Sequence, residues 1–211
     1  MRFKFFRHEV SRGTGFLEKS IGDSGEDCDV GDSLVGVGEL TSKVTQIGLD
    51  GRFVVVVVRG RRKFDGLKRA EDNIGKIIEA SLTRGMIDAA GGADLRSRLT
   101  LSTQYSQAAT AQLAIEAAFE DMAVKQEILG KLDAVLSADA VLATNTSYLD
   151  INEIVAPLTD PTRVIGLHFF APAHIMKLLE IVQGAQSSDR AIATGYALAK
   201  RLVKVPVCAG V

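Results

Sequence analysis

Short apolar runs alternate with amphipathic segments along the chain from about residue 64 onward. The runs have the length of strands and lie at 99–102, 111–119, 140–144, 163–170, 176–182 and 205–211. The amphipathic segments repeat apolar residues at helical spacing and lie at 64–85, 121–136 and 187–204, with shorter helices after residue 85 and at 149–158. Strands that alternate with helices are typical of an α/β fold. We therefore predict a mostly parallel sheet with flanking helices.

The first 63 residues have a different character. The stretch "GDSGEDCDVGDS" (22–33) is acidic, rich in glycine and nearly devoid of core residues, which is typical of a loop or of disorder. We predict an irregular or disordered segment over 1–33 and a single folded domain over 34–211. The run "FVVVVV" (53–58) has the composition of a strand buried on both faces, as in a parallel sheet.

Composition excludes few functions, but it narrows the class of protein. The chain has 211 residues, of which 46% are hydrophobic and 24% charged, and a net charge of −1, so charge gives no support for nucleic-acid or membrane binding. No window has the length of a membrane helix, and the basic start lacks the apolar core of a secretory signal. Two cysteines without ligand spacing predict no metal site and a reducing compartment. We expect a cytoplasmic location, with mitochondrion and peroxisome as the alternatives.

His168 and Glu180 stand inside two consecutive apolar runs. A neutral imidazole can take a proton near neutral pH, and a carboxylate on the neighbouring strand can orient it and stabilise the imidazolium. The alternative is a buried histidine that serves packing, with Glu180 as a charge on an edge strand. Spacing alone favours that alternative about two to one.

Two further groups follow the ends of predicted strands, where ligands bind in such sheets. Asn145 and Ser147, in "TNTS", can hydrogen-bond a substrate oxygen or a cofactor amide, or one of them can cap the next helix. Glu120 and Lys125 lie just past another strand, and from these residues alone an ordinary helix start with an acidic first turn is the better explanation of them.

A weak dinucleotide-binding signal precedes these motifs. "GVGELT" has Gly36 and Gly38, but Thr41 stands where the fingerprint requires a third glycine. The acid expected at the end of the second strand is missing, and Arg59 stands there instead. An arginine at this place can accept the 2′-phosphate of NADP. A glycine-rich loop without a cofactor is the alternative.

Three long motifs resemble the NAD-binding domain of the 3-hydroxyacyl-CoA dehydrogenase family: "LAIEAAFEDMAVKQEI", "ATNTSYLDINEI" and "RVIGLHFFAPAHIMKLLEIV". The resemblance runs from about residue 65 to 211 and implies a Rossmann-type fold. It implies that His168 is the catalytic base, that Glu180 orients and polarises it, and that Ser147 contacts the substrate oxygen and the cofactor. Asn145 lies in the same motif, and the resemblance places Glu120 and Lys125 near the cofactor ribose and nicotinamide. His8 and His174 match no functional position.

The same resemblance implies oxidation of a 3-hydroxyacyl-CoA with NAD in fatty-acid β-oxidation, by proteins that are usually oligomeric. The alternatives are a remnant that binds no cofactor, and an NADP-linked reductase. The incomplete fingerprint leads us to hypothesise that residues 1 to about 63 include out-of-frame or degenerate coding sequence. We also expect the helical C-terminal domain of the family to be missing, and therefore an incomplete domain with an open site and weak turnover.

Overall fold

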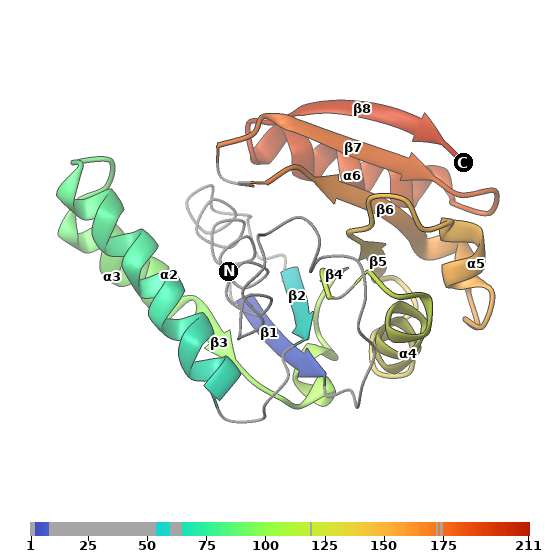
Figure 1. The fold of residues 1–211 in the computed structure, drawn as a ribbon, viewed down its shortest axis with the longest axis horizontal. Coiled ribbons are helices and arrows are strands. Elements are labelled where there is room, and N and C mark those ends of the chain that lie inside the picture. The colour runs from blue at the N-terminus through green and yellow to red at the C-terminus, as the bar shows by residue number, and fades with distance from the viewer. Residues whose placement is uncertain (1–2, 9–53, 60–64, 119, 172, 174) are drawn as a thin grey trace, which may run out of the picture.

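The computed structural model describes residues 3–8, 54–59, 65–118, 120–171, 173 and 175–211. Within these residues, eight strands form one sheet in the order β3-β1-β2-β4-β5-β6-β7-β8 (Figure 1). The strands are β1 (Phe3–His8), β2 (Val54–Arg59), β3 (Leu99–Leu101), β4 (Leu113–Glu116), β5 (Val141–Thr144), β6 (Val164–Phe169), β7 (Leu178–Gln183) and β8 (Val205–Gly210). Every pairing is parallel except that of β6 with β7. The prediction of a mostly parallel sheet is confirmed.

Five α-helices flank the described sheet: α2 (Asp65–Thr83), α3 (Ala89–Ser97), α4 (Met122–Asp133), α5 (Ile151–Val155) and α6 (Asp189–Arg201). Two short 3-10 turns, η2 (Tyr105–Ala108) and η3 (Pro161–Arg163), lie between them. None of the helices in the described ranges is long and apolar enough to cross a membrane.

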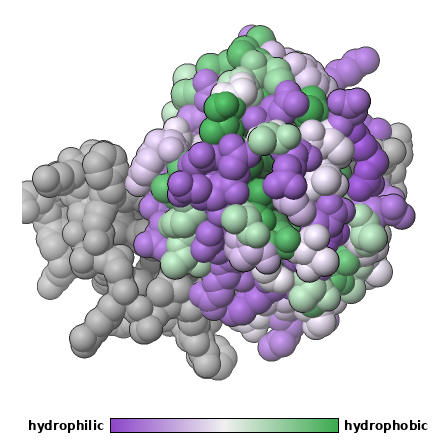
Figure 2. All heavy atoms as spheres, turned by 90° about the vertical axis from the view of Figure 1, so that its right-hand side faces the viewer, coloured by the Kyte–Doolittle hydropathy of each residue, from purple (hydrophilic) through white to green (hydrophobic). Residues whose placement is uncertain are grey.

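Two apolar cores lie on opposite faces of the sheet, because alternate residues of a strand point to opposite sides. Leu113 and Ile115 of β4 belong to the core that also contains residues of α2, α3 and α6. Ala114, between them, belongs to the core under α4 and α5. This arrangement of helices on both faces is that of a doubly wound α/β domain. On the side of the molecule shown in Figure 2, hydrophilic and hydrophobic residues are interspersed.

Polar side chains fix the starts of the helices that follow β4, β5 and β7. Asp121 accepts a hydrogen bond from the Val124 N–H at the start of α4, and Asp150 accepts one from the Asn152 N–H at the start of α5. Ser188 does the same at the start of α6, through the Ala191 N–H. Such caps satisfy backbone donors that have no partner inside the helix. The caps of α4 and α5 set where these two helices leave the sheet edge that carries the site, whereas α6 starts at the opposite edge, because β7 runs antiparallel to β6.

The start of the chain differs from expectation. Residues 1–33 were predicted to be irregular, but Phe3–His8 forms β1 and pairs with both β2 and β3. That part of the prediction is wrong, because "FKFFRH" mixes aromatic and basic residues and so lacks the apolar pattern of a buried strand. The acidic stretch 22–33 lies outside the described residues.

Candidate active site

The carboxyl ends of β4, β5 and β6 meet at one edge of the sheet, because these three strands are parallel neighbours. After β2 the chain continues to β3, which lies at one edge of the sheet. After β4 it continues to β5, which lies on the opposite side of β4 from β2. Strand order therefore reverses between β2 and β4, and a crevice for a ligand forms at such a switch point. Most of the residues singled out in the sequence lie at this edge.

His168 and Glu180 face each other across the antiparallel pair β6 and β7. They occupy directly opposite positions in the ladder, and His168 Nδ1 lies 2.8 Å from Glu180 Oε2. The side chains are 17% and 35% exposed, so the pair is shielded but reachable. Because Nδ1 is engaged by the carboxylate, Nε2 is the nitrogen able to take up a proton. The ring of Phe170 packs against the imidazole, with 4.4 Å between the ring centroids.

Asn145 connects the end of β5 to the strand that carries His168. Its side-chain Oδ1 accepts a hydrogen bond from the Phe169 N–H at 3.0 Å, and its own backbone N–H donates to the Glu116 carbonyl at 2.7 Å. The side-chain oxygen is thus used to hold β6, and the amide nitrogen is the remaining polar atom of the side chain. Asn145 positions the residue next to the histidine.

Ser147 lies exposed on the turn after β5, and it does not cap the helix that follows. Asp150 takes that part at α5, so helix capping is not the explanation for Ser147. The Ser147 backbone N–H donates to Glu120 Oε1 at 2.6 Å, and the Thr146 hydroxyl donates to the same oxygen. Glu120 therefore holds the turn on which the serine hydroxyl is presented.

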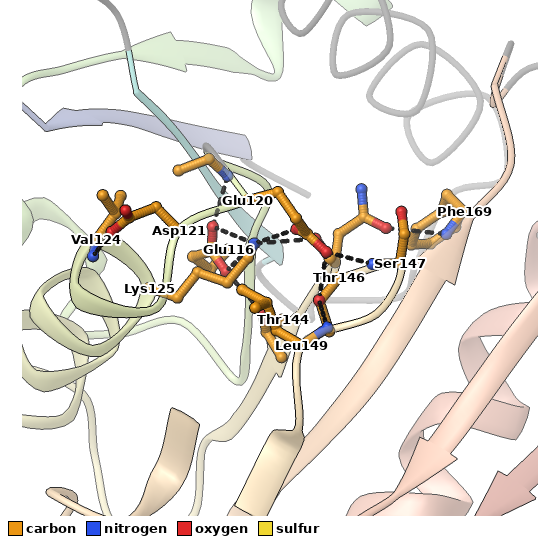
Figure 3. A network of polar contacts seen from close by, with 12 residues as sticks. Glu116, Glu120, Asp121, Val124, Lys125, Thr144, Thr146, Ser147, Leu149 and Phe169 are labelled. Atoms are coloured by element: carbon orange, nitrogen blue, oxygen red, sulfur yellow. Dashed lines mark hydrogen bonds and ion pairs between the residues drawn. The ribbon is translucent and has the colours of Figure 1, made fainter. Parts of the chain in front are cut away.

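Lys125 lies beneath this turn and has no exposed surface. Its ammonium contacts both carboxylate oxygens of Glu116 at 3.2 and 3.0 Å, the Asn145 carbonyl at 3.0 Å and Glu120 Oε2 at 3.3 Å (Figure 3). An ordinary solvated helix start is therefore ruled out for Lys125. Its burial also gives no support to direct contact with a cofactor. Glu120 is 15% exposed, and its part in cofactor binding stays a prediction.

Glu116 is the functional candidate that the sequence reading missed. It ends β4, is fully buried, and accepts hydrogen bonds from the Thr144 hydroxyl at 2.6 Å and the Ala118 N–H at 2.5 Å. The signal was present as an ionisable residue that ends the apolar run "LAIE", with a lysine nine positions later. A buried charge of this kind needs a partner.

The connection between β6 and β7 is held by a lysine that lies near the C-terminal end of the chain. Lys204 is buried just before β8, and its ammonium donates to the carbonyl oxygens of Ala173 and Met176. It also lies 5.9 Å from the centre of the Phe169 ring. These contacts fix the chain segment that joins the strands of His168 and Glu180.

Of the residues predicted from the dinucleotide-binding signal, the structure describes only Arg59. Gly36 and Gly38 lie outside the described residues, as does His174. Arg59 ends β2, which pairs with β4 and so occupies the position of the first strand in the classic doubly wound order. The next strand outward from β4 is β1, with His8 opposite Arg59, and a part for Arg59 in cofactor binding stays a prediction.

Comparison with known proteins identifies the family. Residues 33–211 match the family described as 3-hydroxyacyl-CoA dehydrogenase, NAD binding domain. The human peroxisomal bifunctional enzyme is 34% identical over 177 residues, which are 84% of this chain and 24% of that protein. A 3-hydroxybutyryl-CoA dehydrogenase of Clostridioides difficile is also 34% identical, over 83% of this chain and 62% of its own length.

A solved structure supports the same fold. The (S)-3-hydroxybutyryl-CoA dehydrogenase of Ralstonia eutropha superposes with a TM-score of 0.76 at 24% identity, over 99% of this chain and 63% of that one. The chain thus spans less than two thirds of the length of these relatives. With its doubly wound sheet, its histidine–carboxylate pair and a match over most of its length, the chain belongs to the 3-hydroxyacyl-CoA dehydrogenase family.

Proposed function

We propose that this domain serves the oxidation of (3S)-3-hydroxyacyl-CoA to 3-oxoacyl-CoA with NAD, in fatty-acid β-oxidation. The observation that carries the proposal is the His168–Glu180 pair, which lies 2.8 Å apart at the carboxyl edge of the sheet in a chain of this family. The relative named for 3-hydroxybutyryl-CoA supports a 3-hydroxyacyl thioester as the class of substrate.

His168 is the proposed general base. In the tautomer with its proton on Nδ1, the imidazole donates to Glu180, and Nε2 accepts the proton of the substrate 3-hydroxyl. Glu180 holds the ring in that orientation and stabilises the imidazolium that forms. In the reverse direction the same imidazolium returns the proton to the ketone oxygen. The Ser147 hydroxyl is proposed to bind that oxygen.

The site fits a dinucleotide in its fold and in its polar groups. Strand order reverses between β2 and β4, and polar side chains follow β4 and β5 at this edge. Glu120 and Asn145 are the described residues proposed to hold the cofactor, together with the segment of Gly36 and Gly38. NAD, when bound, supplies the acceptor for the hydride that leaves C3 of the substrate.

The test is a titration of the purified chain with NADH and, in parallel, NADPH, followed by fluorescence. We expect saturable binding of NADH and reduction of acetoacetyl-CoA. His168→Ala should abolish the reduction and leave NADH binding within about twofold, since general acid–base catalysis contributes about 10²- to 10⁴-fold. Lys200→Ala, an exposed position on α6, is the control.

Three results would contradict the proposal. Activity that survives His168→Ala would remove the base assignment. Preference for NADPH would favour an NADP-linked reductase, in which Arg59 takes part. Binding of neither nucleotide would identify the chain as a remnant without a cofactor. The relatives named as peroxisomal enzymes support a peroxisome as the location, which fluorescent tagging of the protein in its own cells would test.

A further inference from the structure

Among the described residues, the Glu116 carboxylate is the acceptor in every hydrogen bond that it makes. The Ala118 N–H and one donor of the Lys125 ammonium reach Oε1, and the Thr144 hydroxyl and the same ammonium reach Oε2. An ionised carboxylate accepts at both oxygens, whereas an amide or a protonated acid places a donor against a donor. The site therefore selects an ionised glutamate, although Glu116 is fully buried.

The ammonium of Lys125 lies between two carboxylates that lead to different parts of the site (Figure 3). Toward the base, Lys125 binds the Asn145 carbonyl, and the Asn145 side chain binds the Phe169 N–H, one residue from His168. Toward the serine, Lys125 binds Glu120, which accepts from the Ser147 backbone N–H. One buried cation thus connects the base and the serine.

From this arrangement we propose that Glu116 is a positioning residue, which sets the placement of His168 relative to Ser147. The proposal rests on the dehydrogenase function proposed above. Without the negative charge at Glu116, the Lys125 ammonium is drawn toward its other carboxylate, Glu120, and away from the Asn145 carbonyl. The turn after β5 then loses its link to β6, and the two reacting groups lose their fixed separation.

Glu116→Gln tests this with a readout that needs neither cofactor nor turnover. Amide hydrogen exchange followed by NMR reports the Asn145, Ser147 and Phe169 N–H groups, which bond within this network. We expect these three amides to exchange at least about tenfold faster in the variant, relative to other amides of β6. In the wild-type chain, local opening at these amides must break charge-assisted hydrogen bonds, and in the variant those bonds are already lost.

The matched control is Asp133→Asn. It removes the carboxylate of another largely shielded ion pair, with Arg163 at 2.6 Å, which lies just before the start of β6, at the opposite end of that strand from His168. Its loss lowers global stability, so we expect all slowly exchanging amides to speed up together. The same uniform change in Glu116→Gln, or no change at the three amides, would overturn the proposal by showing a structural role alone.

Kinetics separate positioning from binding. Glu116→Gln should lower kcat for acetoacetyl-CoA reduction by at least about tenfold with KM within about twofold, since misplacement of reacting groups costs turnover more than affinity. Glu116→Asp, which keeps an acceptor-only carboxylate, should recover part of kcat; no recovery, or a change confined to KM, counts against positioning.

A second variant and the wild-type chain complete the design. If Glu116→Gln does not fold, Thr144→Val removes one donor to Glu116 without changing shape, and the same three amides should respond in the same direction. Uniform exchange there would again overturn the proposal. The two proposals can fail separately. If the wild-type chain neither binds NADH nor reduces acetoacetyl-CoA, while the variants still show the local exchange pattern, the proposed dehydrogenase function is wrong and the structural link through Glu116 is retained.

Discussion

Gly166→Ala is predicted to destabilise the domain at the strand that carries His168. A Cβ on Gly166 would lie 2.6 Å from Ile151 Cδ1 and 2.8 Å from Val182 Cβ, whereas ordinary contact begins at 3.4 Å. The neighbours must therefore retreat by 0.8 and 0.6 Å. Val182 is the cross-strand partner of Gly166 and its Cβ moves only with the backbone of β7, while Ile151 is 1% exposed at the start of α5, so neither contact is relieved without a shift of packed neighbours.

The free energy follows from these distances. Overpacking of a core costs about 1–3 kcal/mol, and two confined partners place this site near the upper value. The alanine recovers about 0.4–1 kcal/mol by restricting the unfolded chain, which leaves a net loss of about 2 kcal/mol. For a chain of this size that corresponds to a fall in Tm of roughly 4–8 °C.

Thermal and urea unfolding followed by circular dichroism measure this loss, with Gly130→Ala as the matched control. Gly130 lies inside α4, and a methyl group added to it would meet no atom within 4 Å, so alanine there should raise stability by about 0.5–1 kcal/mol. The two variants make the same chemical change, and we expect opposite effects on the free energy of unfolding. A Gly166→Ala protein that melts at or above the wild-type temperature would refute the packing of α5 and β7 against β6.

Three further predictions follow from other contacts. Glu180→Gln should lower kcat about 100-fold with little change in NADH affinity, because the imidazolium of His168 loses its counter-charge; unchanged kcat would contradict the pairing. Lys204→Met should lower the free energy of unfolding by about 1–3 kcal/mol in urea titrations, because buried carbonyl oxygens lose their donor. The Thr162 side-chain hydroxyl holds the pKa of Asp160 below its usual range, so its stabilisation is present above the unfolded pKa and is lost as pH falls through the folded one. The stability difference between wild type and Asp160→Asn should thus shrink between about pH 5 and about pH 2, and a difference that grows toward acid would show the opposite sign.

The sequence predicted the parts of the fold that depend on local pattern. Alternating apolar runs and helical periods located the strands and helices after residue 64 to within a few residues, because burial on two faces leaves a strong hydrophobic signal. The same runs placed His168 and Glu180 on adjacent strands, and the structure brings them into contact. Their catalytic roles stay predictions.

What the sequence did not predict depends on contacts between distant segments. Lys125 stands one turn into a helix, where a lysine is usually solvated, and only the packing of α4 under the turn after β5 buries it. Glu116 stands out as a candidate only through its buried ion pair with that lysine. Ser147 and Asp150 are both residue types that cap helices, and the observed first turn of α5, at Ile151, decides for Asp150.

The antiparallel step between β6 and β7 has a consequence for how the site can form and vary. It brings His168 and Glu180 together across only 12 positions of the chain, whereas the parallel pairings need crossovers. Contacts of such short range form fast and carry little loop-closure cost. The histidine and its partner can therefore assemble early in folding, from a single hairpin-like unit. Changes in the first strands of the sheet leave that unit's register untouched, so the His168–Glu180 pair tolerates divergence in β1, β2 and β3.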